Sequence, residues 1–149
     1  KGSYFALAPP GGMALDHLVY PLPPGASDSG AGGLGIHATP DLFGGVRLGP
    51  DAEYGARLDL AVDPNRADFF AESVRHYLPQ VEASWCRADF AGLRPKLAGP
   101  GEEFRDFIVQ EESARGLPGL INCVGIESPG LTAALAIAER VVAGVRGET

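Results

Sequence analysis

The stretch LINCVGIESPGLTAALAIAERVV, residues 120–142, decides how the chain is organised. An apolar run over 120–126 stops at the polar turn 127–130, and apolar residues then recur at helical spacing. We expect a strand that is apolar on both faces, as in a buried parallel sheet, and a helix with Ser128 as N-cap and Pro129 at its first position. The predicted inward face of this helix comprises Leu131, Leu135, Ala138, Val142 and Val145.

Upstream of this stretch the sequence predicts a sheet and one helix. Apolar residues at helical spacing predict a helix over 65–78, and Asp63 followed by Pro64 is typical of its N-terminus. Residues 90–97 are expected to be extended, and the 41–45 turn should join two strands into a hairpin. The predicted strands are 4–7, 17–22, 34–39, 45–49, 58–62, 107–109 and 120–126.

This order of elements predicts an α+β fold in two parts. Residues 1–110 would form an antiparallel or mixed sheet with helices on one face. Residues 111–149 would form the closing strand and helix of a second domain, because a buried parallel strand needs neighbours for which this chain has few candidates. A chain that begins at Lys1 rather than Met fits a processed protein or a piece of a larger one.

Charge and composition argue against several classes of protein. The net charge of −7, without a basic cluster, argues against a nucleic-acid partner. No apolar stretch reaches the roughly 18 residues of a membrane span, so we expect a cytoplasmic protein with no transmembrane segment, at most peripheral to a membrane. Cys86 and Cys123 lack the spacing of metal ligands, so we expect no metal site and two free thiols, although a disulfide stays open.

Two further segments carry little chemistry of their own. The glycine-rich residues 30–35 precede a strand instead of linking a strand to a helix, so a hairpin loop is favoured over a dinucleotide-binding turn. Residues 30–33 of this stretch belong to a predicted loop over 23–33. The acidic residues within 101–112 are expected to form a solvated loop.

Several motifs together resemble one protein family. The main ones are Lys1-Gly2 with Tyr4-Phe5, the Gly-Leu-Arg-Pro-Lys of 92–96, and the Gly-Ile-Glu-Ser-Pro-Gly-Leu-Thr of 125–132. Three shorter motifs accompany them, at 17–21, 35–39 and 48–50. With these motifs the whole chain resembles the C-terminal part of L-2-hydroxyglutarate dehydrogenases. These belong to the FAD-dependent oxidoreductase superfamily that includes D-amino-acid oxidase, glycine oxidase and sarcosine oxidase.

The resemblance implies a fold, a cofactor and a partner. In that superfamily an N-terminal half, which this chain lacks, holds the glycine-rich turn for the FAD pyrophosphate. Residues 1–110 would belong to the substrate domain, and 111–149 would complete the Rossmann-like FAD domain of the missing half. The implied activity is oxidation of a small 2-hydroxy acid resembling 2-hydroxyglutarate, by hydride transfer to the flavin. The isolated chain is expected to be inactive and to bind FAD weakly.

Four side chains are candidates for substrate chemistry, each with a purely structural role as the competing interpretation. Arg94 would hold a substrate carboxylate with its planar fork, or it would pair with Asp89 or a nearby glutamate. Lys96, two residues on in an extended segment, would face the same ligand, or it would be solvated. His37 would accept the hydroxyl proton, or it would be a core or edge histidine. Tyr20 would bind a carboxylate, or it would be a core tyrosine with a wet hydroxyl.

The turn at the start of the last helix is the candidate for cofactor contact. Amides at a helix N-terminus are unpaired and carry partial positive charge, which suits the anionic edge of a reduced flavin. Gly130 would allow the backbone to approach the ring. The competing interpretation is an ordinary buried strand followed by a core helix. The candidate cofactor-binding residues are Gly125, Ser128, Pro129, Gly130, Leu131 and Thr132.

Two other functions stay open. The first is oxidation of an amine, as in glycine or sarcosine oxidase, which needs no strong base if the amine arrives neutral. The second is a non-catalytic module that binds an acidic small molecule or a partner chain, which the missing nucleotide motif favours.

Overall fold

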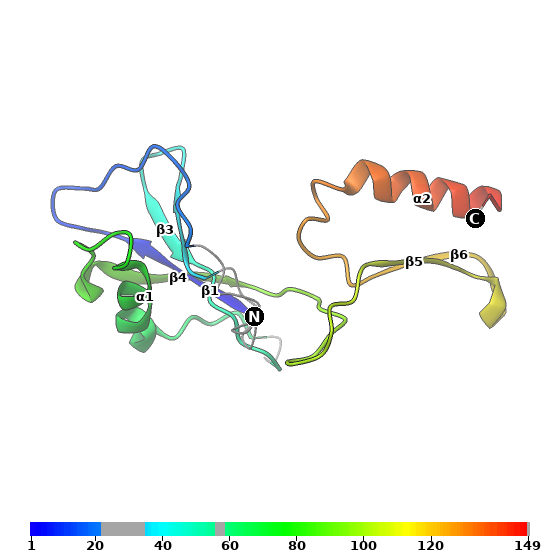
Figure 1. Ribbon diagram of the computed structural model, residues 1–149, viewed down its shortest axis with the longest axis horizontal. Coiled ribbons are helices and arrows are strands. Elements are labelled where there is room, and N and C mark those ends of the chain that lie inside the picture. Colours follow the sequence, from blue (N-terminus) through cyan, green and yellow to red (C-terminus); the bar gives the residue numbers. More distant parts are fainter. Residues whose placement is uncertain (22–34, 56–58, 149) are drawn as a thin grey trace. The chain divides into compact units, whose positions relative to one another are not determined.

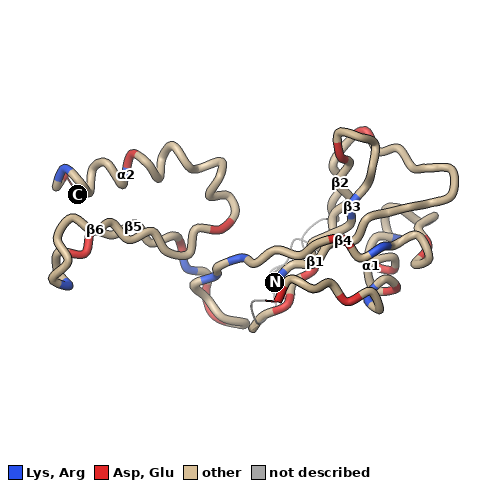
Figure 2. Tube along the Cα trace, turned by 180° about the vertical axis from the view of Figure 1, so that it is seen from behind, with Lys and Arg blue, Asp and Glu red and all other residues tan. Residues whose placement is uncertain are grey.

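The computed structural model describes residues 1–21, 35–55 and 59–148, and the chain divides into two compact units, Lys1–Leu93 (unit 1) and Arg94–Thr149 (unit 2) (Figure 1). The predicted loop 23–33 lies outside the described residues, as do parts of the segments 17–22, 30–35, 34–39 and 58–62. Lys and Arg are interspersed with Asp and Glu along the described trace (Figure 2).

Unit 1 is built on a four-stranded antiparallel sheet in the order β2-β3-β1-β4. The strands are β1 (Gly2–Leu7), β2 (His37–Pro40), β3 (Val46–Gly49) and β4 (Cys86–Gly92). The hairpin predicted around residues 41–45 is confirmed. Asp41 stabilises its turn because its carboxylate accepts hydrogen bonds from the amides of Phe43 and Gly45, both at 2.8 Å.

One face of this sheet is covered by α1 (Ala67–Val74), which follows a 3₁₀ turn at Pro64–Arg66. The predicted helix start is confirmed, since the Asp63 carboxylate accepts a hydrogen bond from the Asn65 amide. The helix ends at Val74, four residues earlier than predicted, and turns follow it up to Pro79. Proline disfavours the helical conformation of the residue that precedes it, so the helix cannot easily continue to Leu78. The core between α1 and the sheet consists of Phe5, Leu7, Ile36, Ala38, Val46, Leu48, Phe70, Ala71, Val74, Leu78, Val81 and Cys86.

Three predicted extended segments of unit 1 need correction. Within 17–21 only Val19 pairs, in an isolated bridge with Ala38, because Pro21 lacks an amide donor and the neighbouring side chains find no core. Residues 59–62 form no strand, and the Asp59 carboxylate instead accepts the Ala61 amide in a local turn. The segment predicted as extended over 90–97 is a strand only as far as Gly92, in β4.

Unit 2 consists of a two-stranded antiparallel sheet and a helix beside it (Figure 1). The strands β5 (Ile108–Glu112) and β6 (Leu117–Val124) are joined by a 3₁₀ turn at Ser113–Arg115 and by Gly116, whose φ is 78°. The sequence predicted a buried parallel strand here, and this prediction is wrong, because β6 pairs with β5 in the antiparallel direction. A short connection can join only antiparallel strands, because a parallel pair needs a long crossover.

The prediction of a solvated acidic segment fails at its C-terminal end. Residues 101–106 are exposed, but Glu112 lies at the end of β5 and is only 3% exposed. Its carboxylate accepts a hydrogen bond from the Asn122 side chain at 3.2 Å and forms an ion pair with Arg115 at 3.3 Å. The Asn122 partner comes from the paired strand β6 and Arg115 comes from the turn between the strands, while the buried Oε2 atom of Glu112 accepts no hydrogen bond from the described residues.

The last helix, α2 (Ala134–Arg146), begins later than predicted and has no side-chain cap. Ser128 does not serve as N-cap and Pro129 is not in the helix, because the chain first closes two turns. The Gly130 amide donates to the Glu127 carbonyl, and the Ala133 amide donates to the Pro129 carbonyl. None of the helices in the described ranges is long and apolar enough to cross a membrane.

The face of α2 that the sequence predicts to be inward is instead open in this chain. Leu131, Leu135 and Val145 are 93%, 83% and 69% exposed. The partly buried side of the helix includes Val141 and Gly144, and Gly144 lies against the Ile121 side chain of β6. α2 therefore has two apolar sides, of which this chain covers one.

Candidate functional site

The Arg94 guanidinium lies at the turn that precedes α2. Its Nε atom is 3.4 Å from Oε2 of Glu127, and the side chains are 47% and 12% exposed, respectively. Asp89, the other acid predicted as a structural partner, is instead bound by Arg47 at 2.8 Å. An ion pair with a glutamate is what a purely structural role predicts, but this glutamate opens the turn proposed for cofactor contact.

A second contact holds the segments of Arg94 and Glu127 together. Gly125, with φ of 70°, packs so closely against Leu97 that an added Cβ would lie 2.6 Å from Leu97 Cδ1. A side chain at position 125 would therefore be strained both by the backbone conformation and by the contact. Glycine allows the 94–97 segment to lie directly against the start of the 125–130 turn.

The segment around Lys96 is bent rather than extended. The Lys96 amide donates a hydrogen bond to the Arg94 carbonyl at 3.0 Å, as in a γ-turn across Pro95. The expectation that residues two apart face the same side assumed an extended chain, so it does not apply here. Lys96 is exposed.

Packing within the turn explains why position 130 is a glycine. Gly130 is buried, and a Cβ there would lie 2.7 Å from the Glu127 carbonyl oxygen. Ser128 and Pro129 are exposed, like Leu131 and Thr132 after them. Within the described part of the chain, the amides of Leu131 and Thr132 donate no hydrogen bond. This turn therefore offers two backbone donors to a group outside the chain.

In unit 1 the structure brings together Tyr20 and His37, two other predicted site residues. Their ring centroids are 5.0 Å apart, and the bridge between Val19 and Ala38 aligns their segments. Tyr20 is 61% exposed, whereas Nε2 of His37 is buried and has no hydrogen-bond partner among the described residues. A neutral imidazole nitrogen without a partner is able to accept a proton or a hydrogen bond.

Two aromatic residues that the sequence interpretation did not select extend this group across the sheet. His37 pairs with Gly49, and the Tyr4 ring lies against Gly49 from the other side. Tyr4 in turn stacks on Phe90 with ring centroids 4.5 Å apart. The alternation of side chains along a strand could have identified Tyr4. Its neighbour Phe5 packs on α1, so Tyr4 must point to the opposite face of the sheet.

Arg94 and His37 belong to different units. His37, Tyr20, Tyr4 and Phe90 form an aromatic row on the sheet of unit 1. Arg94 and the 125–132 turn form a polar group in unit 2 that holds one exposed guanidinium and two unpaired amides. The first group suits stacking and proton acceptance, and the second suits an organic anion.

Comparison with known proteins gives the family. The sequence profile of the FAD dependent oxidoreductase family matches residues 1–143. The chain belongs to this family of FAD-dependent oxidoreductases, as its motifs indicate, and FAD is the cofactor of the family's members.

The curated relatives agree with this assignment. The mitochondrial L-2-hydroxyglutarate dehydrogenase of Arabidopsis thaliana is 40% identical over 151 residues, which cover 95% of this chain and 30% of the relative. A glycerol 3-phosphate dehydrogenase of Caloramator mitchellensis is 31% identical, over 95% of this chain and 27% of the relative. The L-2-hydroxyglutarate dehydrogenase of Escherichia coli K12 is 40% identical over 52 residues, 35% of this chain. The chain thus spans no more than 30% of the length of these relatives.

Proposed function

We propose that this chain supplies the substrate-binding sheet and the flavin-facing turn of an FAD-dependent dehydrogenase that oxidises a small 2-hydroxy acid resembling 2-hydroxyglutarate. The observation that carries the proposal is the contact between Arg94 and Glu127, 3.4 Å long. It puts a cation suited to a carboxylate beside the turn suited to the cofactor. The 40% identity to an L-2-hydroxyglutarate dehydrogenase supports this choice of substrate class.

The turn before α2 fits the edge of a flavin ring. When bound, FAD supplies the hydride acceptor of the reaction. The unpaired amides of Leu131 and Thr132 would donate to the ring edge that becomes anionic on reduction. Gly125, Ser128, Pro129 and Gly130 would hold these amides in place as the backbone of the turn. The stabilisation expected from a helix start is about 0.3–1 kcal/mol, and up to ~2 kcal/mol where it is partly buried.

Charged side chains would bind the substrate carboxylates, and an imidazole would accept the proton of its hydroxyl group. Arg94 would bind the carboxylate next to the reacting carbon, and Lys96 and Tyr20 would bind the second carboxylate. His37 would take the hydroxyl proton, a role that its unpartnered Nε2 supports. Because Nε2 of His37 is buried, the residues around it would have to open for the substrate hydroxyl to reach that nitrogen.

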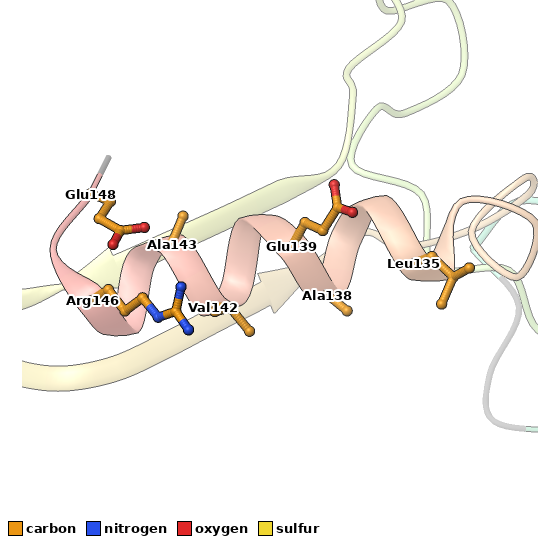
Figure 3. Close-up of a pocket in the computed structure, with 7 residues that line it drawn as sticks. All are labelled: Leu135, Ala138, Glu139, Val142, Ala143, Arg146 and Glu148. Atoms are coloured by element: carbon orange, nitrogen blue, oxygen red, sulfur yellow. The ribbon is translucent and has the colours of Figure 1, made fainter.

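The partner proposed for unit 2 is the N-terminal FAD-binding half of the same protein. Along the open face of α2, Leu135, Ala138 and Val142 form an apolar strip, with Glu139 and Arg146 beside it (Figure 3). The exposed Leu135 and Val142 in this strip favour burial against another surface. The assignment of residues 1–110 to the substrate domain and of 111–149 to the FAD domain stays a prediction. So does the cytoplasmic location; the Arabidopsis relative is named as mitochondrial.

A second candidate substrate is glycerol 3-phosphate, which one relative at 31% identity is named for. It also presents a hydroxyl group and an anion, so the same arginine, lysine and histidine would serve it. Amine oxidation and non-catalytic acid binding are the two further candidate functions. Amine oxidation differs from both alcohol oxidations because it does not need the His37 imidazole as a base. Non-catalytic acid binding differs from them because the protein would carry no flavin.

A reductive titration of the full-length protein tests the proposal. The purified protein is mixed without oxygen with 2-hydroxyglutarate, glycerol 3-phosphate, glycine or sarcosine, and the flavin absorbance is followed. We expect 2-hydroxyglutarate to bleach the flavin most efficiently. Bleaching by an amine alone would transfer the assignment to the amine oxidases, and a protein without flavin absorbance would leave only the non-catalytic module.

Substitution of Arg94 tests the residue roles in the same assay. Arg94→Ala removes two charge-assisted hydrogen bonds of about 1.5–3 kcal/mol each, so kcat/KM should fall by roughly 10²- to 10⁴-fold. Arg94→Lys keeps the charge but loses the fork, and should recover only part of that loss. An unchanged kcat/KM in Arg94→Ala would remove this arginine from the substrate site.

A further inference from the structure

Glu127 lies behind the guanidinium that we assign to the substrate. Its side chain is 12% exposed, whereas that of Arg94 is 47% exposed, so the carboxylate is the inner member of the pair and the guanidinium the outer. The contact runs from Nε of Arg94 to Oε2 of Glu127 at 3.4 Å. Arg94 makes no other side-chain hydrogen bond or ion pair within the described ranges.

The atoms in contact decide what the arginine has left to offer. A guanidinium presents five N–H donors in a planar fork, and a carboxylate binds it best through two parallel bonds. Glu127 contacts the Nε side of the group. The two terminal nitrogens therefore keep a complete edge for a second carboxylate. At 3.4 Å the contact exceeds the 2.7–2.9 Å typical of a charge-assisted hydrogen bond, so Glu127 orients the group without fully engaging it.

The backbone on both sides of this pair is fixed by packing. The Gly130 amide bonds to the carbonyl of Glu127, and the Lys96 amide bonds to the carbonyl of Arg94. The contact between Gly125 and Leu97 then joins the two segments. The two side chains thus project from backbones that are held against each other, which limits the directions in which the guanidinium can point.

We propose that Glu127 is a positioning residue for substrate binding. It holds Arg94 through Nε, so that the terminal nitrogens face the incoming carboxylate. This inference rests on the proposed function of Arg94. Without Glu127 the arginine keeps its charge but samples more rotamers, so substrate binding weakens more than the chemical step does. The effect of Glu127 must also depend on the presence of Arg94.

A double-mutant cycle in the full-length enzyme tests this dependence. Glu127→Ala should raise KM for 2-hydroxyglutarate on the order of tenfold, with a smaller change in kcat. The same change in an Arg94→Ala background should leave KM unaltered, because there is no guanidinium left to position. Glu127→Gln keeps an acceptor of the same size and should recover part of the loss.

The control is Glu102→Ala, which removes a glutamate of the same unit that pairs with Arg105 at 3.5 Å, accepts the Gly99 amide at 3.1 Å and, in the described part of the chain, forms no hydrogen bond or ion pair with Arg94 or Glu127. Its KM should match that of the wild type. Thermal denaturation checks the folding of each variant, and Glu127→Gln carries the test if Glu127→Ala fails to fold. An unchanged KM in the Glu127 variants, or an equal loss in both backgrounds, would overturn the positioning role while the proposed function stands. A wild-type enzyme whose flavin is not reduced by 2-hydroxyglutarate would overturn the function and the inference together.

Discussion

Unit 1 has a core of buried apolar side chains between its sheet and α1, whereas no large apolar side chain in the described part of unit 2 is buried. Phe5, Phe70 and Leu48 are fully buried in unit 1. In unit 2 the buried residues among those described are Glu112 and Gly130, a carboxylate and a residue without a side chain. Both units have regular strands and one helix, so the contrast lies in what covers the elements rather than in the elements themselves.

The contrast indicates that the two units depend differently on the rest of the protein. Apolar burial is the main favourable term in folding, at roughly 25 cal/mol per Å² of apolar surface removed from water. Unit 1 has this contribution within the chain. Unit 2 has α2 against one side of a two-stranded sheet, but among its described residues no apolar side chain is buried, so this contribution is small within the chain. Its open α2 face, with Leu135 at 83% exposure, is where that packing is expected.

The largest expected difference in stability is between a substitution in the core of unit 1 and one on the open face of unit 2. Phe70→Ala removes a ring that packs on Phe5 at 4.5 Å, and should lower the free energy of unfolding of unit 1 by about 3–5 kcal/mol. Leu135→Ala changes an exposed side chain of unit 2 and should shift it by less than about 0.5 kcal/mol. Chemical denaturation followed by the fluorescence of Trp85, the one tryptophan, measures the first in unit 1, and hydrogen exchange of the α2 amides measures the second in unit 2. Equal effects would contradict the division between a filled and an open unit.

A smaller effect is expected at the buried carboxylate of unit 2. Glu112→Ala leaves the Asn122 amide without its acceptor and should cost about 1–3 kcal/mol locally. Arg115→Ala removes the exposed partner of the same ion pair, with a side chain 68% exposed, and should cost no more than about 1 kcal/mol. Hydrogen exchange of the β5 and β6 amides measures both. A larger loss from Arg115→Ala would mean that charge, rather than the buried hydrogen bond, holds this sheet together.

The smallest effect concerns the contact between the end of α1 and the sheet of unit 1. The Tyr77 hydroxyl donates to the Ile36 carbonyl at 2.6 Å, and burial raises the pKa of Tyr77 from 10.0 to about 12. Because the folded pKa lies above the unfolded one, this stabilisation is complete below pH 10 and is lost as pH rises towards 12. An alkaline absorbance titration should show a late component that Tyr77→Phe removes. A late component that persists in Tyr77→Phe would assign it to another residue.

Local chemistry made parts of the fold predictable from the sequence. Asp63 followed by Pro64 marked the start of a helix, and the residues around Asp41 marked a hairpin turn; both are confirmed. In each case the signal and the structure lie within a few residues of each other. The end of α1 was less predictable, because apolar spacing continues through Leu78 while the backbone has already left the helix at Val74.

The elements that failed are those whose surroundings decide their role. The spacing of Leu131 and Leu135 shows that a face of α2 is apolar, but no spacing says which chain covers it. The pairing of β6 with β5, instead of with parallel neighbours, has the same cause, since pairing depends on which strands are at hand. The strand predicted over 17–22 failed within its described residues 17–21 for a related reason, because Leu18 and Tyr20 stay exposed and only Val19 packs against the core.

The candidate site was predictable as motifs but not as contacts. The motifs at 92–96 and 125–132 stand apart in the sequence, and Arg94 was expected to bind a substrate or a nearby acid. That the acid is Glu127 follows from packing between residues far apart in sequence, such as Leu97 and Gly125. Tyr4 and Phe90 were missed because an aromatic residue in a strand most often belongs to the core.

Hydrogen exchange of the isolated chain, compared with the same residues in the full-length flavoprotein, tests the central contrast most directly. We predict that peptides covering 117–124 and 134–146 exchange much more slowly in the full-length protein, because the proposed FAD-binding half would cover β6 and α2. Peptides covering β1 and α1 should exchange at the same rate in both. Equal protection of α2 in the two samples would contradict this contrast, since unit 2 would then need no proposed partner to complete it.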